Sequence, residues 1–416
     1  MSGPALTGPF KSQRARSVTS ALDAGIAALA TFVVGVYAVR VLELESLGVY
    51  ALVFSGVLLT SEIPNQLVFT PLLAEVARWD RVERASAARL GLVKGALPML
   101  ISAVLMCVVF LFLPRSLSTA ETLILLISGG LAAASQAAQL YLRRLQYYSG
   151  YSVRSLIAAF LRLVGSGAAL LFLSGRFPSV AVPLSSLAFG NLVAIAFLIL
   201  RTGGPPGRTV HGVLSRGSFL LVSVVGMRGA VFLGSYVIFR LAGASALGYA
   251  EAARVVAQPV VVLGLGLLLT SEPLIVGHSL TSRLDRLVSV RRFHLLALAA
   301  GTIVYLTVAA CACGWNPMFH LLPAAYVIPG LVVVAVAAAS IQAAARPFRA
   351  ELIAQRLEKK VLLSSAPAMV AILGISFLAA DIGAFALPVG IFGGGLLALV
   401  GVVAFTRRRH RHPSPV

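Results

Sequence analysis

Charged side chains are scarce in this chain of 416 residues, where they make up 12% of the sequence. An average soluble domain carries about 25%, so the composition excludes a disordered protein, a coiled coil and an ordinary cytosolic enzyme. Acidic residues are the scarcest, with 14 Asp and Glu against 34 Lys and Arg, and the formal net charge is +20. The three cysteines all lie in or beside apolar runs, so we predict no disulfide framework, no metal site and no cofactor.

Apolar residues, in contrast, fill 59% of the chain, and the mean hydropathy is +0.94. A helix needs about 20 mostly apolar residues to cross a bilayer, and the sequence contains twelve such runs. The runs lack the alternation of a barrel strand, so we predict an all-α polytopic membrane protein with about twelve transmembrane helices. The predicted spans are 18–41, 47–73, 92–113, 122–142, 155–173, 182–200, 217–241, 247–276, 293–314, 327–345, 361–380 and 385–405.

Lys and Arg gather in alternate connections between these runs. Seven segments, among them both termini, 143–154 and 346–360, hold 27 of the 34 basic residues. Such segments stay in the cytoplasm, so we predict a multi-pass protein of the cell (plasma or inner) membrane with both termini cytoplasmic. The basic excess then indicates topology and contact with anionic membrane lipids, and not nucleic acid. The connections are too short for a catalytic or nucleotide-binding domain, so we expect no enzyme.

The middle of the chain divides it into two similar halves. Residues 201–209 read Arg-Thr-Gly-Gly-Pro-Pro-Gly-Arg-Thr, a composition that cannot continue a helix. We therefore predict an N-terminal lobe over 1–200, a cytoplasmic linker over 201–216 and a C-terminal lobe over 217–416. Arg40 stands eight residues before Gly48, and Arg240 stands eight residues before Gly248. Because each half has six helices, the predicted relation is a parallel repeat about an axis along the membrane normal.

The two repeated hairpins also carry a resemblance to a known family. Val39–Tyr50 reads Val-Arg-Val-Leu-Glu-Leu-Glu-Ser-Leu-Gly-Val-Tyr, and Leu241–Ala253 reads Leu-Ala-Gly-Ala-Ser-Ala-Leu-Gly-Tyr-Ala-Glu-Ala-Ala. These stretches resemble the polysaccharide-flippase branch of the multidrug/oligosaccharidyl-lipid/polysaccharide (MOP) superfamily. The chain departs from the family pattern at Leu47, where Phe is usual, and at 61–66, where a small or Gly-rich end is usual.

The resemblance implies a function that composition alone does not give. It implies a transporter that flips a lipid-pyrophosphate-linked oligosaccharide across the bacterial inner membrane by alternating access. Cell-envelope polysaccharide biosynthesis is the implied destination, and polysaccharide synthesis enzymes are possible partners.

Ionisable residues inside the predicted spans are the candidate functional residues. A charge at mid-bilayer costs about 2.5–3.5 kcal/mol on insertion scales, so it usually faces a cavity or a partner. Arg228 lies twelve residues before the helix-end Arg240, about 18 Å deeper, beyond the reach of snorkelling. We expect a water-filled cavity in which Arg228, Arg254 and Arg162 hold the pyrophosphate, because guanidinium stays charged and donates a fork of hydrogen bonds.

Polar and acidic residues complete this predicted cavity. Amides are expected to meet sugar hydroxyls, and they are Gln258, Asn65, Gln66, Gln136 and Gln139. Asp23, Glu62 and Glu251 are candidates for binding a coupling H⁺ or Na⁺. The alternative is that the intramembrane charges pair only with one another and hold helices together.

Two other functions remain open at this point. A multidrug/cation antiporter of the same architecture would require carboxylates and aromatics with few arginines in its cavity. A non-transporting scaffold of a polysaccharide synthesis complex would require no cavity at all. The three intramembrane arginines favour an anionic cargo over the first alternative.

Overall fold

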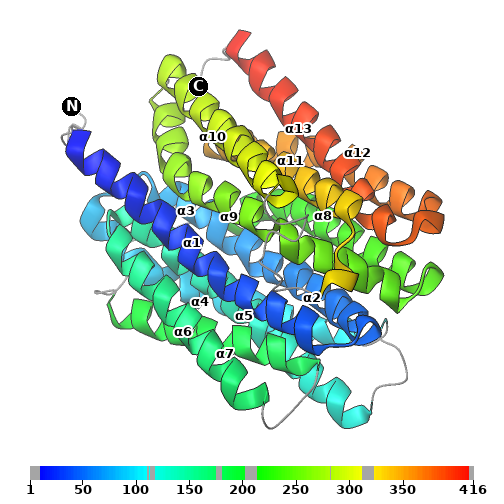
Figure 1. Cartoon of the computed structure of the whole chain (residues 1–416). Coiled ribbons are helices and arrows are strands. Elements are labelled where there is room, and N and C mark those ends of the chain that lie inside the picture. The colour runs from blue at the N-terminus through cyan, green and yellow to red at the C-terminus, as the bar shows by residue number, and fades with distance from the viewer. Residues whose placement is uncertain are drawn as a thin grey trace.

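The computed structural model describes residues 10–109, 112, 118–174, 180–201, 213–281, 283–311 and 323–411. All regular structure in these residues is helical, with no strand (Figure 1). The elements are α1 (Phe10–Val41), α2 (Leu44–Pro64), η1 (Asn65–Phe69), α3 (Thr70–Val76), α4 (Arg81–Val109), α5 (Thr119–Ser149), α6 (Ser152–Ser174), α7 (Ala181–Leu200), α8 (Val213–Leu241), α9 (Ala244–Leu280), α10 (Leu284–Cys311), η3 (Ala324–Tyr326), α11 (Pro329–Ala354), α12 (Glu358–Leu378), η4 (Ala380–Phe385) and α13 (Ala386–Arg411).

The predicted apolar runs correspond to these helices. Eleven helical segments are long and apolar enough to cross a membrane, and α1 adds a shorter apolar stretch, Gly25–Val41. The prediction of an all-α polytopic protein is confirmed, although the predicted ends at 113 and 314 lie outside the described residues. Several helices continue beyond their apolar runs, so that α5 has 31 residues and α9 has 37. These extensions carry most of the charged residues discussed below.

The second membrane-spanning segment changes helix type at its middle. The α-helical α2 ends at Pro64, a π-helical turn covers Asn65–Phe69, and α3 continues as α-helix. Proline lacks the N–H that would bond the preceding turn, and π turns inside helices are frequent at functional sites. Helix α9 contains Pro259 and is assigned as one continuous α-helix through it. The Tyr305 hydroxyl donates to the Val256 carbonyl, three residues before this proline.

The helices pack as two sets. Helices α1–α7 pack mainly against one another, and so do α8–α13; we call these sets the first half and the second half. Figure 1 shows the blue-to-teal first half on one side of the bundle and the green-to-red second half on the other. Contacts between the halves run mainly from α1, α2 and η1 to α8 and α9. Helix α8 begins at Val213, so the end of the predicted linker is helical, while 202–212 lie outside the described residues.

The two repeated hairpins touch each other where the halves meet. A Cβ on Gly48 would lie 2.1 Å from the Ala244 carbonyl oxygen, and a Cβ on Gly248 would lie 2.4 Å from the Leu44 carbonyl oxygen. Real Cβ atoms do not come that close, so glycine is what lets α2 and α9 approach. The contact is reciprocal, as a twofold relation between the halves would require. The repeat itself stays a prediction.

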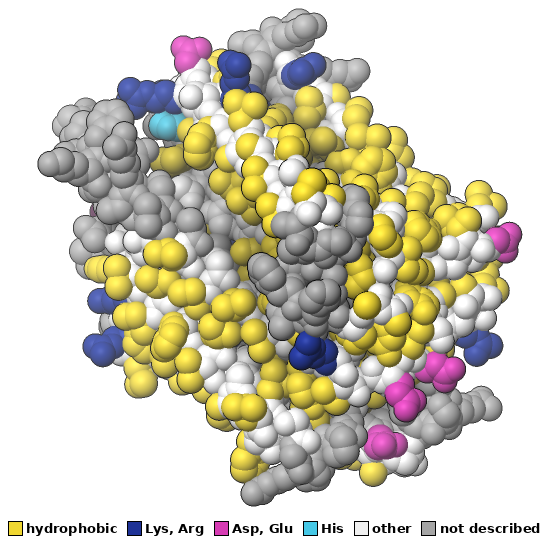
Figure 2. All heavy atoms as spheres, in the orientation of Figure 1, with side chains coloured by type: hydrophobic (Ala, Val, Ile, Leu, Met, Phe, Trp, Pro, Cys, Tyr) yellow, Lys and Arg dark blue, Asp and Glu magenta, His cyan; other side chains and the backbone are white. Residues whose placement is uncertain are grey.

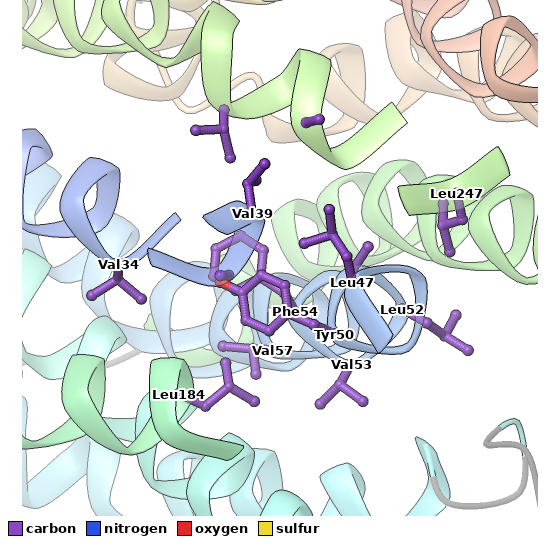
Figure 3. Close-up of a cluster of buried hydrophobic side chains, with 14 of the residues drawn as sticks. Val34, Val39, Leu47, Tyr50, Leu52, Val53, Phe54, Val57, Leu184 and Leu247 are labelled. Carbon is purple, nitrogen blue, oxygen red and sulfur yellow. The ribbon is translucent and has the colours of Figure 1, made fainter. Parts of the chain in front are cut away.

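The largest buried cluster joins the two halves around α2 (Figure 3). Leu47 and Tyr50 of α2 lie beside Val39 of α1 and Leu247 of α9, and all four are fully or almost fully buried. In water, burying a large apolar side chain stabilises a fold by about 1.5–3 kcal/mol. Between helices in lipid, close van der Waals packing provides the stabilisation instead. Apolar packing therefore helps to fix the hairpin ends.

Hydrophobic side chains cover much of the outer surface. Figure 2 shows them over the middle of one face, with most of the charged side chains toward its rims. The apolar stretches of α4 and α10 are the least buried, with 28% and 22% of residues inside the protein. Exposed Val93, Val104 and Ile303 lie on those two helices. This distribution and the eleven spans support a multi-pass membrane protein, and which side holds the termini stays a prediction.

Candidate functional site

Glu62 lies at the centre of a polar cluster between the two halves. The π turn directs the amides of Asn65 and Gln66 back at Glu62, where each donates to Oε2 over 2.8 Å. Arg228 on α8 places its Nε 3.9 Å from Glu62 Oε1, across the boundary between the halves. The structure thus brings together four of the predicted site residues. The Arg228 side chain remains about one-third exposed and keeps hydrogen-bond donors free for another partner.

Two further arginines reach this cluster from α11. We predicted a cytoplasmic connection over 346–360, but α11 continues to Ala354, so Arg346 and Arg349 are helical; their cytoplasmic placement stays a prediction. Both guanidinium groups lie within electrostatic range of Glu62 and Arg228. Arg346 Nη1 and Arg349 Nη2 are buried atoms without a hydrogen-bond partner. They are charged donors held inside the bundle with unused bonding capacity.

Arg144 completes the cluster from α5. It donates to Glu272 of α9 in an ion pair between the halves, and it is also within electrostatic range of Glu62. We call Arg144, Arg228, Arg346 and Arg349, with Glu62 and Glu272, the central charge group. Four guanidinium groups against two carboxylates leave an excess of two positive charges. In a low-dielectric interior such an excess attracts an anion strongly.

The predicted residues of α9 form a separate arrangement. Arg254 holds Glu251 with two hydrogen bonds of 2.6 and 2.7 Å, and its Nη1 donates to Gln258 over 3.3 Å. The guanidinium also stacks 4.7 Å from the centre of the Phe54 ring on α2. Charge is balanced within this pair, so its geometry agrees with the structural alternative. The Arg254 side chain is one-third exposed, so part of its guanidinium group remains accessible.

Asp23 and Arg162 lie within the first half, away from the central charge group. Asp23 is fully buried, and its Oδ1 lies 2.8 Å from Arg143 Nη2. Tyr147 and Ser155 donate to its Oδ2 over 2.5 and 2.8 Å. Arg162 on α6 donates to α1 and has no contact with Arg228, so the predicted trio of arginines does not form one site.

The two predicted glutamines of α5 lie on the same half. Gln139 is buried, with its Nε2 unpartnered, and stands one turn before Arg143. Gln136 is half-buried one turn earlier. Both therefore continue the helix face that holds Asp23, and neither belongs to the central charge group.

Sequence reasoning missed Arg143, Arg144, Arg346 and Arg349. The predicted helices ended where the apolar runs ended. The four arginines lie just beyond those ends, so they were counted with the connections between helices. A signal was present on α11, where Gln342, Arg346 and Arg349 recur at i, i+4 and i+7. Polar residues at helical spacing beyond an apolar run indicate a helix that continues with one face buried.

Ion pairs join the halves at the end of the bundle that we predict to be cytoplasmic. Glu75 of α3 accepts from Arg216 of α8 and, over 3.1 Å, from Arg356 between α11 and α12. Arg216 also binds Glu358 of α12 at 2.7 Å. We call the contacts of Glu75 with Arg216 and Arg356, together with Arg144–Glu272, the inner-end ion pairs. They close this end, and the hairpin contact at Gly48 and Gly248 closes the other.

Metal-ligating residues do not gather in the part of the chain that the structure describes. No three His, Cys, Asp or Glu side chains there come close enough to hold a metal ion.

Comparison with known proteins places this geometry. No protein-family model and no curated protein matches the sequence. Solved structures do match: a MATE protein in complex with MaL6 superposes with a TM-score of 0.70 over 97% of both chains, at 13% identity. The chain has the fold of the MATE transporters. A second MATE structure, described as an outward-facing multidrug resistance transporter of the MOP superfamily, matches with a TM-score of 0.67 over 97% of this chain and 96% of that chain, at 14% identity.

A third solved structure also matches this fold. It is a MOP superfamily transporter from Pyrococcus furiosus, with a TM-score of 0.68, 13% identity and 98% coverage of both chains. It is described as having a binding pocket of reverse polarity that suggests a different function. The MOP superfamily in the predicted resemblance thus agrees with the fold, and the branch within it is a separate question.

Proposed function

We propose that this chain is a membrane transporter that binds the pyrophosphate of a lipid-linked oligosaccharide at the central charge group and flips it outward by alternating access. The observation that carries the proposal is the excess of two positive charges inside the bundle, with unpartnered N–H groups on Arg346 and Arg349. A pyrophosphate diester carries about two negative charges and would balance that excess. The cargo would serve cell-envelope polysaccharide synthesis across the inner membrane.

Guanidinium groups suit this cargo for two physical reasons. They stay charged at every physiological pH, and their planar fork donates two parallel hydrogen bonds to phosphate oxygens. Arg228 is one-third exposed and shares Glu62 with two amides, so it can turn to a ligand without leaving Glu62 unpaired. Asn65 and Gln66 keep their amide oxygens unpartnered, and these can accept from sugar hydroxyls.

Arg144 links the cargo site to the inner-end ion pairs. It bonds Glu272 across the halves and lies within range of Glu62. A phosphate in the central charge group would compete with Glu272 for Arg144 and so weaken a contact that closes the inner end. Binding of cargo would thereby bias the two halves toward a different arrangement, which alternating access requires.

A coupling ion would bind one of three carboxylates. Asp23 is fully buried and contacts Arg143, Tyr147 and Ser155, and Glu251 is ion-paired with Arg254. Glu62 is the most accessible of the three candidates and faces Arg228 at 3.9 Å. We therefore assign coupling by H⁺ or Na⁺ to Glu62. Contacts with anionic lipids and with polysaccharide synthesis enzymes remain predictions from the sequence.

A multidrug/cation antiporter is the second candidate, because MATE structures with this fold include a multidrug resistance transporter. A cationic drug requires unpaired carboxylates. Here Glu62 shares the central charge group with four arginines, and the other two candidate carboxylates are ion-paired. Charge therefore favours the anionic cargo.

The test measures binding of farnesyl pyrophosphate to the purified full-length protein, followed by glycan export in cells that lack the native gene. The double variant Arg346→Gln/Arg349→Gln removes two charges from the central charge group. We expect about 100-fold weaker binding and loss of export, since a charged hydrogen bond contributes about 1.5–3 kcal/mol. Arg228→Ala should also abolish export while the protein stays in the membrane.

The matched control is Arg40→Gln/Arg240→Gln, which removes two exposed guanidinium groups from helix ends. This control should keep both binding and export. Unchanged binding in the Arg346→Gln/Arg349→Gln variant would overturn the proposal. Ethidium efflux that depends on Glu62, without pyrophosphate binding, would establish the antiporter, and glycan export without any bound pyrophosphate would indicate a scaffold.

A further inference from the structure

The interior of the first half holds buried hydrogen-bond donors that have no acceptor. Gln139 Nε2, Arg143 Nε and Arg162 Nε are all buried atoms without a partner. Their side chains are between 2% and 6% exposed. Gln139 and Arg143 stand one turn apart on α5. Arg143 and Arg162, the latter on α6, donate to the backbone carbonyls of Asp23 and Ala27, which are one turn apart on α1. The three donors therefore belong to one neighbourhood.

This neighbourhood also carries an excess of positive charge. Asp23 is its carboxylate: Oδ2 accepts from Tyr147 and Ser155, and Oδ1 forms an ion pair with Arg143 at 2.8 Å but no hydrogen bond. Arg162 donates instead to neutral oxygens of α1, over 3.0 Å each: the Ala27 carbonyl and the Thr31 hydroxyl. Among the described residues, no carboxylate forms an ion pair with Arg162. One guanidinium charge is thus buried without a counter-charge.

An uncompensated buried charge is too costly to be left alone in a folded protein. Transfer of an isolated ion into a low-dielectric interior costs several kcal/mol even after relaxation, so buried charges are paired. A cation would add to the excess charge, and the Asp23 carboxylate already has Arg143 as its counter-charge. A small anion, in contrast, would accept from the free N–H groups and would balance Arg162.

We propose that the first half binds a small monovalent anion of the chloride type between Arg143 and Arg162, within reach of Gln139. This site differs from the central charge group in its partners: Arg143 and Arg162 bond to α1 of the same half, whereas the central charge group has ion pairs between the halves. The anion would hold together the three helices that carry Asp23, Gln139 and Arg162. The site therefore couples the stability of the first half to the halide in solution.

The first experiment compares thermal unfolding of the full-length protein in sodium chloride and in sodium gluconate at equal ionic strength. A bound ligand raises Tm by mass action, and we expect a Tm about 3 °C higher in chloride. Bromide should replace chloride, and potassium chloride should act like sodium chloride. Arg162→Gln should abolish the difference between chloride and gluconate.

Arg291→Gln is the matched control, since Arg291 is equally buried but pairs with Glu351 at 2.7 Å. This variant should lower Tm in both salts and keep the chloride effect. A chloride effect that persists in Arg162→Gln, or that needs sodium, would overturn the proposal.

A second measurement does not depend on any variant folding. Wild-type crystals soaked in sodium bromide should give an anomalous peak between the Arg143 and Arg162 guanidinium groups. Absence of that peak at full bromide exchange would also overturn the proposal. Since the Arg346→Gln/Arg349→Gln variant leaves this site intact, it should retain the chloride effect even if pyrophosphate binding is lost.

Discussion

Replacing Glu75 by Gln should open the inner end of the bundle. Glu75 accepts from Arg216 and Arg356, and it lies 3.8 Å from Arg78 of its own half. Removing its charge disconnects α3 from both partners in the second half at once. The remaining contact of the inner-end ion pairs is then Arg144–Glu272.

The size of this effect follows from the exposure of each partner. Arg216 and Glu75 are each about one-fifth exposed, so their pair can be worth about 1–1.5 kcal/mol. Arg356 is 55% exposed, and solvent screening reduces its contribution to about 0.3 kcal/mol. A combined loss of about 1.4 kcal/mol shifts the equilibrium between closed and open inner ends by about tenfold.

The assay is the rate at which a polar maleimide labels a cysteine at Ala74. This residue packs against the second-half cluster around Leu220 and Leu352, and opening uncovers it. The background replaces the three native cysteines by Ser. We expect Glu75→Gln to raise the labelling rate of Ala74→Cys about tenfold.

Glu45→Gln is the control, since Glu45 is an exposed carboxylate at the other end of the bundle. It should leave the labelling rate at Ala74 unchanged. Equal rates in the Glu75 variant and its parent would refute the view that these ion pairs hold the inner end closed.

Two further changes test packing and pairing. Arg143→Gln leaves the carboxylate of Asp23 buried without its counter-charge, which should cost about 3–5 kcal/mol and lower Tm, and Asp23→Asn in the same chain should recover part of the loss. Gly48→Ala places a Cβ against the Ala244 carbonyl oxygen, so Tm should fall by the equivalent of about 1–3 kcal/mol despite the better helix propensity of Ala.

The membrane helices could be predicted because their signal is local. An apolar run of sufficient length can bury itself in lipid whatever its neighbours are, and each of the twelve predicted runs overlaps a described helix. The ends of the helices were harder to predict. Helices α5 and α11 continue into polar sequence because other helices, not lipid, cover Arg144 and Arg346.

The candidate site was predicted only in part, for the same reason. Glu62, Asn65 and Gln66 were grouped correctly because one turn of helix holds all three. The contact of Arg228 with Glu62 joins residues 166 positions apart, and nothing local to either residue specifies it. Arg162 was placed with Arg228 on charge alone, and the fold separates them.

The sequence alone determined that this chain is a bundle of membrane helices with a few arginines among them, because hydrophobic length and charge count are properties of single segments. The tertiary structure decided which arginines share a site. It balances Arg254 with Glu251, joins Arg346 and Arg349 to Arg228, and leaves Arg162 on neutral oxygens. That choice depends on how helices from both halves face one another, since the free energy of a buried charge is set by its neighbours in space.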